Sequence, residues 1–270
     1  MCAARSELIS SANDPRLPEI TQRHYYLNFK YHHDGGHFTA YETEYYNRIE
    51  FNLPIARFQG VHLSQIPEDK ADEVITSIIA RYEEIDKPWK WWIGPTCKPD
   101  NLPEYLERHG LEYRGEQPYM AVELDKLNEV DVPDELEIRL VEDSETLRLW
   151  SKAVATGTGY PQYVDELYAV ESHENLWLPH RRRYVGFSDG VPVCGSCVLV
   201  DLGVAGIYYV ATVPEARRRG FGTAITLAPL KDSSELGVKV GVLHSSAMGY
   251  GVYKRIGFKD IGKHSEYQLP

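Results

Sequence analysis

The segment 207–230 constrains the fold most, because a strand, a glycine-rich turn and a helix follow one another there without a gap. Aromatic and β-branched residues alternate with a period of two over 207–213, which predicts a half-buried or buried strand. Apolar residues at helical spacing over 224–230 predict the helix. The turn between them reads Arg217-Arg218-Arg219-Gly220-Phe221-Gly222-Thr223. The fold must therefore contain a strand whose end leads directly into a helix N-terminus.

This turn has the properties of an anion site. The first N–H groups of a helix have no intrahelical partner and carry the positive end of the helix dipole, so anions bind there. Gly220 and Gly222 have no Cβ, which lets the backbone lie directly against a phosphate. Two other glycine motifs are excluded. No Lys follows Gly222, as a P-loop requires, and Ile225 stands where a dinucleotide fingerprint has its third glycine.

A second motif follows about thirty residues later. The run 238–243 reads as a short strand, and 248–256 as a short helix. The end of this helix carries Tyr253-Lys254-Arg255-Ile256-Gly257-Phe258. The two motifs, Arg-x-x-Gly-x-Gly and Tyr-x-x-x-Gly-Phe, stand in the order typical of one family. They resemble the motifs of the GNAT superfamily of N-acetyltransferases, whose first pattern is Gln/Arg-x-x-Gly-x-Gly/Ala. The resemblance covers residues 136–270.

The order of elements over 136–270 agrees with this resemblance. Before the motifs we expect a strand at 136–141, a helix at 144–155 capped by Asp143 or Ser144, a helix at 162–171, and a hairpin of 183–187 with 191–200 around Asp189-Gly190. After them we expect two closing strands. The resemblance implies an α/β (α+β) fold with a mixed central sheet flanked by helices, in which two parallel strands splay apart and hold acyl-coenzyme A. Pro229 predicts a bend in the helix that follows the loop.

The first half of the chain repeats this plan. Pro67 and Pro214 are 147 positions apart, and so are Arg108 and Arg255. A helix at 67–85, a strand at 89–93 and a helix at 101–109 are expected in the same order as in the second half. A constant offset between two separate motifs favours duplication of one α/β unit, although chance matching of short strings is the alternative. We therefore predict two tandem GNAT-like domains, at 1–125 and 136–270, joined by a charged linker at 126–135.

The two halves differ where the chemistry would be. At the offset of 147, Glu73 and Ile75 stand in place of Gly220 and Gly222, and Leu106 in place of Tyr253. An acidic residue would repel a pyrophosphate, and a leucine cannot donate a proton. The sequence therefore predicts that the N-terminal half is a degenerate GNAT-like domain without a cofactor site.

The resemblance implies roles for particular residues of the second half. The loop 217–223 would cradle the pyrophosphate through its backbone, and the strand end 210–212 would bond the pantetheine arm and direct an N–H group at the thioester oxygen. Tyr253 would be the general acid that protonates the leaving thiolate. Ser246 stands where many family members carry an Asn that contacts the cofactor. The implied cofactor-binding residues are Val210, Ala211, Thr212, Arg217, Arg218, Arg219, Gly220, Phe221, Gly222, Thr223 and Ser246.

The sequence does not single out a general base. Several family members carry a Glu on the strand before the loop, whereas 206–213 contains no carboxylate. Tyr208, His244, or a water chain to Asp201 or Glu171 could relay the proton. The family builds its acceptor site around a segment that corresponds to 160–174, and the acidic residues there suit an ammonium-bearing acceptor or a solvated helix face.

We predict no metal site. Cys194 and Cys197 have the Cys-x-x-Cys form, but residues three apart on a strand point to opposite faces, so their thiols cannot meet on one metal. His32, His33, Asp34 and His37 surround Gly35-Gly36, which is more typical of a surface turn.

The charge of the chain bounds its partners. A net charge of -11 over 270 residues argues against nucleic-acid and anionic-membrane partners and favours a cationic acceptor. No segment has the length of a membrane span or the apolar core of a signal peptide, so we expect a cytoplasmic protein, and a homodimer is compatible with these features. The leading hypothesis is transfer of acetyl from acetyl-coenzyme A to a primary amine of a small molecule or protein. The alternative is a non-catalytic coenzyme A-binding or protein-interaction module.

Overall fold

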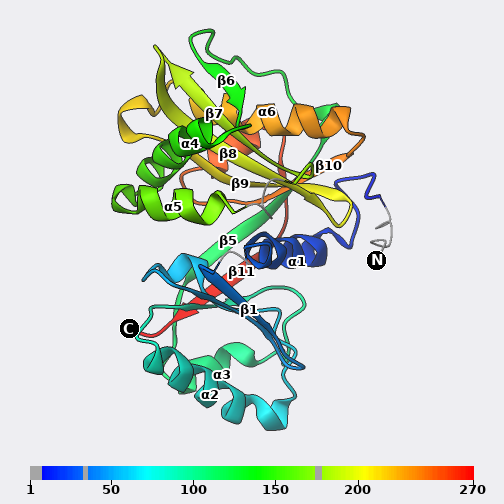
Figure 1. Cartoon of the computed structure of the whole chain (residues 1–270). Coiled ribbons are helices and arrows are strands. Elements are labelled where there is room, and N and C mark those ends of the chain that lie inside the picture. The colour runs from blue at the N-terminus through cyan, green and yellow to red at the C-terminus, as the bar shows by residue number, and fades with distance from the viewer. Residues whose placement is uncertain (1–7, 33–35, 174–177) are drawn as a thin grey trace. The chain divides into compact units, whose positions relative to one another are not determined.

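The structure is a computed structural model that describes residues 8–32, 36–173 and 178–270 (Figure 1). The sequence-based interpretations of His33, Asp34, Gly35 and Glu174 fall outside these residues. Contacts divide the chain into two compact units. The C-terminal unit consists of Tyr119–Ile261 with Met1–Leu17, and the N-terminal unit of Pro18–Pro118 with Gly262–Pro270.

The C-terminal unit follows the predicted order of elements as far as its last helix. Its elements are β6 (Glu137–Leu140), α4 (Ser144–Gly157), η5 (Pro161–Tyr163), α5 (Val164–Glu171), β7 (Arg181–Ser188), β8 (Val191–Asp201), β9 (Val204–Thr212), η7 (Pro214–Ala216), α6 (Phe221–Glu235), β10 (Val240–His244) and α7 (Tyr250–Ile256). One strand, β11 (Lys259–Gln268), replaces the two closing strands that the sequence predicted. The missing neighbour of β10 is supplied by β5 (Glu112–Glu123), whose end pairs with β10 in antiparallel register.

The sheet of this unit is mixed, which confirms the predicted fold class. Its strand order is β5-β10-β9-β8-β7-β6. The pair β9–β10 is parallel, whereas the other neighbours in this order are antiparallel. A parallel pair needs a crossover connection, and α6 supplies it.

Local sequence signals set two of the boundaries as expected. Asp143 caps α4 in a capping box, because its carboxylate accepts from the Thr146 N–H at 2.7 Å while the Thr146 hydroxyl reaches back to the Asp143 N–H. Asp189 and Gly190 both have positive φ, 53° and 75°, and join β7 to β8. Positive φ at both central residues is the requirement of a tight hairpin turn, so the predicted hairpin is confirmed.

Helices α6 and α4 cover opposite faces of this sheet. Cys194 belongs to the core cluster that contains Ile225 of α6, and Cys197 to the cluster that contains Trp150 of α4. The two thiols therefore point to opposite faces, as predicted from their spacing on a strand. A Cβ on Gly195 would lie 2.7 Å from the Val154 side chain, so glycine there allows α4 to approach β8 closely.

Helix α6 continues through Pro229 to Glu235. A proline has no N–H, so Pro229 cannot donate to the carbonyl of Ile225, four residues earlier. The Ser196 hydroxyl on β8 donates to that carbonyl instead, at 2.7 Å and in a buried position. The neighbouring strand thus satisfies the backbone oxygen that the proline leaves without a helical partner.

The N-terminal unit has the same arrangement around a parallel pair. Its elements are α1 (Leu17–Lys30), β1 (Phe38–Glu42), β2 (Asn47–Phe51), η2 (Ala56–Phe58), β3 (Gly60–His62), η3 (Glu68–Lys70), α2 (Ala71–Glu84), β4 (Lys90–Ile93), α3 (Leu102–Arg108), the start of β5 and the end of β11. Its strand order is β1-β2-β3-β4-β11, with β3–β4 parallel and β4–β11 antiparallel. The sequence did not predict α1, β1 and β2.

Two strands run from one unit into the other. The end of β5 pairs with β10, and the end of β11, at 265–267, pairs with β4. Each unit thus receives a strand that begins after the other unit's short helix. The predicted limits at 125 and 136 stay a prediction about domains, and the units found from contacts differ from them at 1–17, 119–135 and 262–270.

The element bounds also revise the alignment of the two halves. Ala71 begins α2 and Phe221 begins α6, so the long helices are offset by 150 positions instead of 147. The N-terminal unit therefore lacks three residues between the proline and the long helix. Gly220 and Gly222 have no counterparts in Glu73 and Ile75, because the loop itself is shorter and α2 starts at once.

We predict that the Ser196 hydroxyl compensates for Pro229. In the wild-type background, Ser196→Ala leaves the buried Ile225 carbonyl without a donor and should cost about 1–3 kcal/mol of unfolding free energy. In a Pro229→Ala background, the restored N–H donates to the same carbonyl, so Ser196→Ala should cost much less. Urea unfolding of the four proteins measures this cycle. An equal cost of Ser196→Ala in both backgrounds would contradict the compensation.

Candidate active site

The candidate site begins where β9 leaves β10. Their parallel pairing covers Ala205, Gly206 and Ile207 on β9, and β9 then continues to Thr212 beside β8 alone. The register between β8 and β9 shifts at this point, and Tyr209 takes a positive φ of 54°. Such a bulge bends a strand and re-aims it. The last residues of β9 therefore pair with β8 on one edge, and their other backbone edge pairs with no strand of the described residues.

A cleft of about 500 Å³ lies along this free edge. It is lined by eleven residues that the sequence singled out, namely Val210, Ala211, Thr212, Arg217, Arg218, Gly220, Phe221, Gly222, Thr223, Ser246 and Tyr253. It is also lined by Gly157, Ala216, Met248, Gly249, Gly251, Val252 and Arg255, which the sequence did not single out. Met248, Val252 and Arg255 follow at helical spacing around Tyr253, and this periodicity is the signal that could have identified them.

The loop before α6 takes an unusual backbone course. Arg218 and Gly220 have positive φ, 64° and 85°, and α6 begins directly after Gly220. A left-handed conformation strains arginine but not glycine. The N-terminus of α6 thus lies at the cleft wall, with Phe221 and Gly222 as its first helical residues. N–H groups at this position, together with the helix dipole, suit a phosphate.

The three consecutive arginines have three different environments. Arg217 donates to the carbonyls of Thr212 and Gly157, at 3.1 and 3.0 Å. Arg218 is exposed and lines the cleft. Arg219 pairs with Glu135 at 2.8 Å and its guanidinium lies 4.6 Å from the centre of the Phe221 ring, so it is not among the lining residues. Of the three arginines, Arg217 and Arg218 line the cleft and Arg219 does not, and the assignment of all three to the cofactor stays a prediction.

Tyr253 projects from α7 into the wall of the cleft and is only 7 % exposed. Burial raises the pKa of its phenol to about 12, because the phenolate would lose its hydration. A Cβ at position 249 would lie 2.7 Å from the Tyr253 ring, so Gly249 leaves the space that the ring occupies. The phenol therefore keeps its proton throughout the neutral range.

Ser246 accepts hydrogen bonds from the backbone of the turn that follows it. Its hydroxyl accepts from the Gly249 N–H at 3.2 Å, and its carbonyl accepts from the N–H groups of Gly249 and Tyr250. These bonds close the turn 246–249 that precedes α7. Ser246 lines the cleft, with its hydroxyl already engaged by the backbone.

Glu171, one of the candidate bases, forms ion pairs with two arginines. The Glu171 carboxylate is fully buried and accepts from Arg183 at 2.7 Å and from Arg181 at 3.1 Å. Two guanidinium groups hold this carboxylate through charge-assisted hydrogen bonds. The same ion pairs keep Glu171 from attracting an ammonium group.

In the N-terminal unit the counterpart of this cleft is closed. The chain after β3 stays bonded to the chain after β4: the Lys98 N–H donates to the Ser64 carbonyl at 2.9 Å, and the Ile66 N–H to the Lys98 carbonyl at 3.1 Å. The two strands therefore remain joined at the point where β9 and β10 separate.

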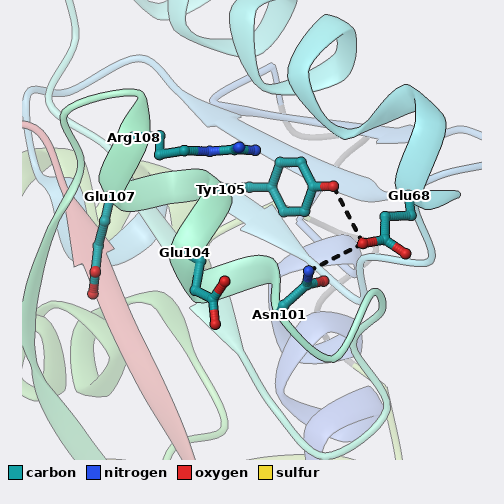
Figure 2. Close-up of a pocket in the computed structure, with 6 residues that line it drawn as sticks. All are labelled: Glu68, Asn101, Glu104, Tyr105, Glu107 and Arg108. Carbon is teal, nitrogen blue, oxygen red and sulfur yellow. Dashed lines mark hydrogen bonds between the residues drawn. The ribbon is translucent and has the colours of Figure 1, made fainter.

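A surface pocket of about 620 Å³ lies nearby in this unit (Figure 2). It is lined by Glu68, Asn101, Glu104, Tyr105, Glu107 and Arg108. Four of these, Asn101, Glu104, Tyr105 and Arg108, stand 147 positions before Met248, Gly251, Val252 and Arg255 of the cleft. Glu68 accepts from Asn101 and Tyr105, and its carboxylate and those of Glu104 and Glu107 disfavour an anion (Figure 2).

The described residues offer neither a metal cluster nor a membrane-spanning helix. No group of three or more His, Cys, Asp and Glu side chains in the described ranges could hold a metal ion. Within the same ranges, no helix combines the length and apolar character needed to cross a membrane.

Comparisons with known proteins agree with this geometry. Residues 160–261 match the family model described as an acetyltransferase (GNAT) domain. No match was found among curated proteins. A GCN5-related N-acetyltransferase from Kribbella flavida has a similar structure, with a TM-score of 0.68, 18 % identity, and coverage of 93 % of this chain and 96 % of that one.

Two further solved structures share the fold. A GCN5-related N-acetyltransferase from Sphaerobacter thermophilus has a TM-score of 0.60 and 16 % identity, over 96 % of this chain and 94 % of that one. A tandem GNAT protein from the clavulanic acid biosynthesis pathway has a TM-score of 0.55 and 14 % identity, over 83 % and 78 %. At these identities the likeness shows the fold, and it confirms the predicted tandem GNAT architecture.

We predict that the two loop glycines act differently. A Cβ at Gly222 meets only the Thr212 hydroxyl at 3.8 Å, so Gly222→Ala should leave stability unchanged or slightly higher. The added methyl lines the cleft and should weaken coenzyme A binding by about tenfold, since a backbone that binds phosphate must approach it closely. Calorimetric titration and thermal unfolding measure both effects.

Gly220→Ala is the matched comparison. Its φ of 85° is left-handed and its Cβ would lie 3.2 Å from Pro133, so this variant should lose about 1–2 kcal/mol of stability. Unchanged coenzyme A affinity in a stable Gly222→Ala protein would remove the loop from the binding site.

Proposed function

We propose that the GNAT domain of this chain is an acyl-coenzyme A-dependent N-acyltransferase that transfers acetyl from acetyl-coenzyme A to a primary amine. The observation that carries this proposal is the cleft at the parting of β9 and β10. It combines a glycine-rich helix N-terminus, a free strand edge and a buried, protonated tyrosine in one lining. An anion site, backbone donors and a proton donor are the three elements that a thioester transfer to an amine needs.

The cofactor would be held mainly by backbone groups. The N–H groups at the start of α6 would bind the pyrophosphate, and Gly220 and Gly222 would let it approach. The free edge of Val210–Thr212 would bond the pantetheine amides as an added strand does. One N–H of this edge would donate to the thioester oxygen, where negative charge develops, and such a donor contributes roughly 3 kcal/mol when it is well placed.

Tyr253 would complete the transfer as the general acid. The amine nitrogen attacks the carbonyl carbon, the C–S bond breaks, and its electron pair stays on the sulfur. The Tyr253 O–H then gives its proton to the thiolate, and the amine loses its extra proton to solvent or to a relay. Because its pKa is about 12, Tyr253 is fully protonated when the thiolate forms.

The non-catalytic alternative is separated from this proposal by turnover. A protein that only binds coenzyme A would bind acetyl-coenzyme A without releasing free thiol in the presence of amines. We keep the cytoplasm as the proposed compartment, where thiols stay reduced, and Cys97, Cys194 and Cys197 are free. The net charge of -11 supports a cationic acceptor.

We predict that Tyr253→Phe retains acetyl-coenzyme A binding and lowers kcat by about 10²- to 10³-fold, the usual effect of losing a general acid. Tyr250→Phe is the matched control. Tyr250 lies on the same helix, but its hydroxyl donates to Asp260 at 2.7 Å and it does not line the cleft. Its variant should stay within about twofold of wild type. The assay detects free thiol across a panel of primary amines, and an unchanged rate for Tyr253→Phe would remove this residue from the mechanism.

We also predict the alkaline behaviour of kcat. Because burial raises the Tyr253 pKa to about 12, the acid form persists well above the ordinary titration of tyrosine near pH 10. The rate at saturating amine should therefore not fall with a midpoint near pH 10 on account of this residue. A fall near that pH in wild type that disappears in Tyr253→Phe would contradict the raised pKa of Tyr253.

A further inference from the structure

The guanidinium of Arg217 joins the ends of two elements that are distant in sequence. Its Nε donates to the Thr212 carbonyl at 3.1 Å, and its Nη2 donates to the Gly157 carbonyl at 3.0 Å. Thr212 is the last residue of β9, and Gly157 is the last residue of α4. Both bonds are made by one planar group, so they fix the two chain ends relative to each other.

The two ends are also packed directly against each other. A Cβ on Gly157 would lie 2.9 Å from the Ala211 Cβ and 2.9 Å from the Thr212 N. No side chain larger than hydrogen fits there without moving the backbone. The last carbonyls of a helix have no intrahelical donor and lie at the negative end of its dipole, so a cationic donor is favoured at Gly157.

This joint lies at the wall of the cleft. Gly157, Thr212 and Arg217 all line it. From Gly157 the chain continues through 158–163 to α5, and the turn starts with the Tyr160 N–H donating to the Ala155 carbonyl at 2.8 Å. The position of Gly157 therefore sets where the segment 158–163 begins.

We propose that Arg217 is a positioning residue that holds the end of α4 against the free end of β9, and that it is not a phosphate ligand. It keeps the spacing between the cofactor edge of the cleft and the segment 158–163, which under the proposed function would border the acceptor. This inference rests on the proposed function, because its test uses coenzyme A and amines as probes. The physical basis is the pair of directed hydrogen bonds that Arg217 donates. An arginine that binds phosphate would act mainly through its charge.

The test compares Arg217→Met, Arg217→Lys and, as the matched control, Arg218→Met. Arg217→Met keeps an alkyl chain but loses the donors and the charge, and Arg217→Lys keeps the charge but loses the planar fork. Arg218 is exposed in the same loop and lines the same cleft. Coenzyme A affinity is measured by calorimetry at low and high salt, and local opening by hydrogen exchange of 158–163.

Arg217→Met and Arg217→Lys should both raise exchange over 158–163 by about tenfold or more, because neither keeps the fork. Arg217→Met should lose less coenzyme A affinity and less salt dependence than Arg218→Met, since it removes a charge from the cleft wall but no direct contact to the ligand. Arg218→Met should leave exchange unchanged, lower the affinity, and make it less sensitive to salt. With the best amine of the panel, Arg217→Met should raise the KM of the amine more than that of acetyl-coenzyme A.

Three results would overturn the proposal. The first is an Arg217→Met protein that loses affinity and salt dependence as Arg218→Met does, with Arg217→Lys restoring both. The second is exchange of 158–163 that stays at the wild-type level. The third is an amine KM that does not change. If wild type binds no coenzyme A, the proposed function fails, while the exchange comparison in the free protein still decides the role of Arg217.

Discussion

The site depends on one break in backbone pairing, the separation of β9 from β10 after Ile207 and Leu243. A central strand normally has both edges bonded, and an unbonded edge needs another partner. After the bulge at Tyr209, the end of β9 pairs with β8 alone. The cleft lies along the other, unpaired edge of β9. The glycine loop, the N-terminus of α6 and Tyr253 all take their places around this gap. Without it, they would line no common space.

The N-terminal unit shows the same scaffold without the break. Its parallel pair β3–β4 is extended by backbone bonds between 64–66 and Lys98, and α2 begins without the intervening loop. Carboxylates line the pocket in which four residues stand 147 positions before lining residues of the cleft. Joined strands leave no free edge for an added strand, and the carboxylates disfavour an anion. The two units therefore differ in two independent physical features, although both have a parallel pair crossed by one long helix.

Part of the site could be predicted because it depends on local backbone. The strand end, the glycines and the start of α6 are contiguous in sequence, and the spacing of Tyr253 on α7 follows from helical period. The environments of the arginines could not be predicted. Arg219 meets Glu135 and Arg217 meets Gly157, partners 84 and 60 residues away in the chain. The cleft residue Gly157 was missed for a related reason, since its partner Arg217 lies 60 residues away in the chain.

The sequence by itself determined the order of elements around the loop, the capping of α4, the hairpin at Asp189-Gly190 and the opposite faces of Cys194 and Cys197. Each follows from periodicity or turn chemistry within a few residues. Only the tertiary structure decided which strands complete each sheet, namely the end of β5 beside β10 and the end of β11 beside β4. It also decided that Arg217 and Arg218, but not Arg219, line the cleft. These outcomes depend on pairing between distant segments, which local propensity does not encode.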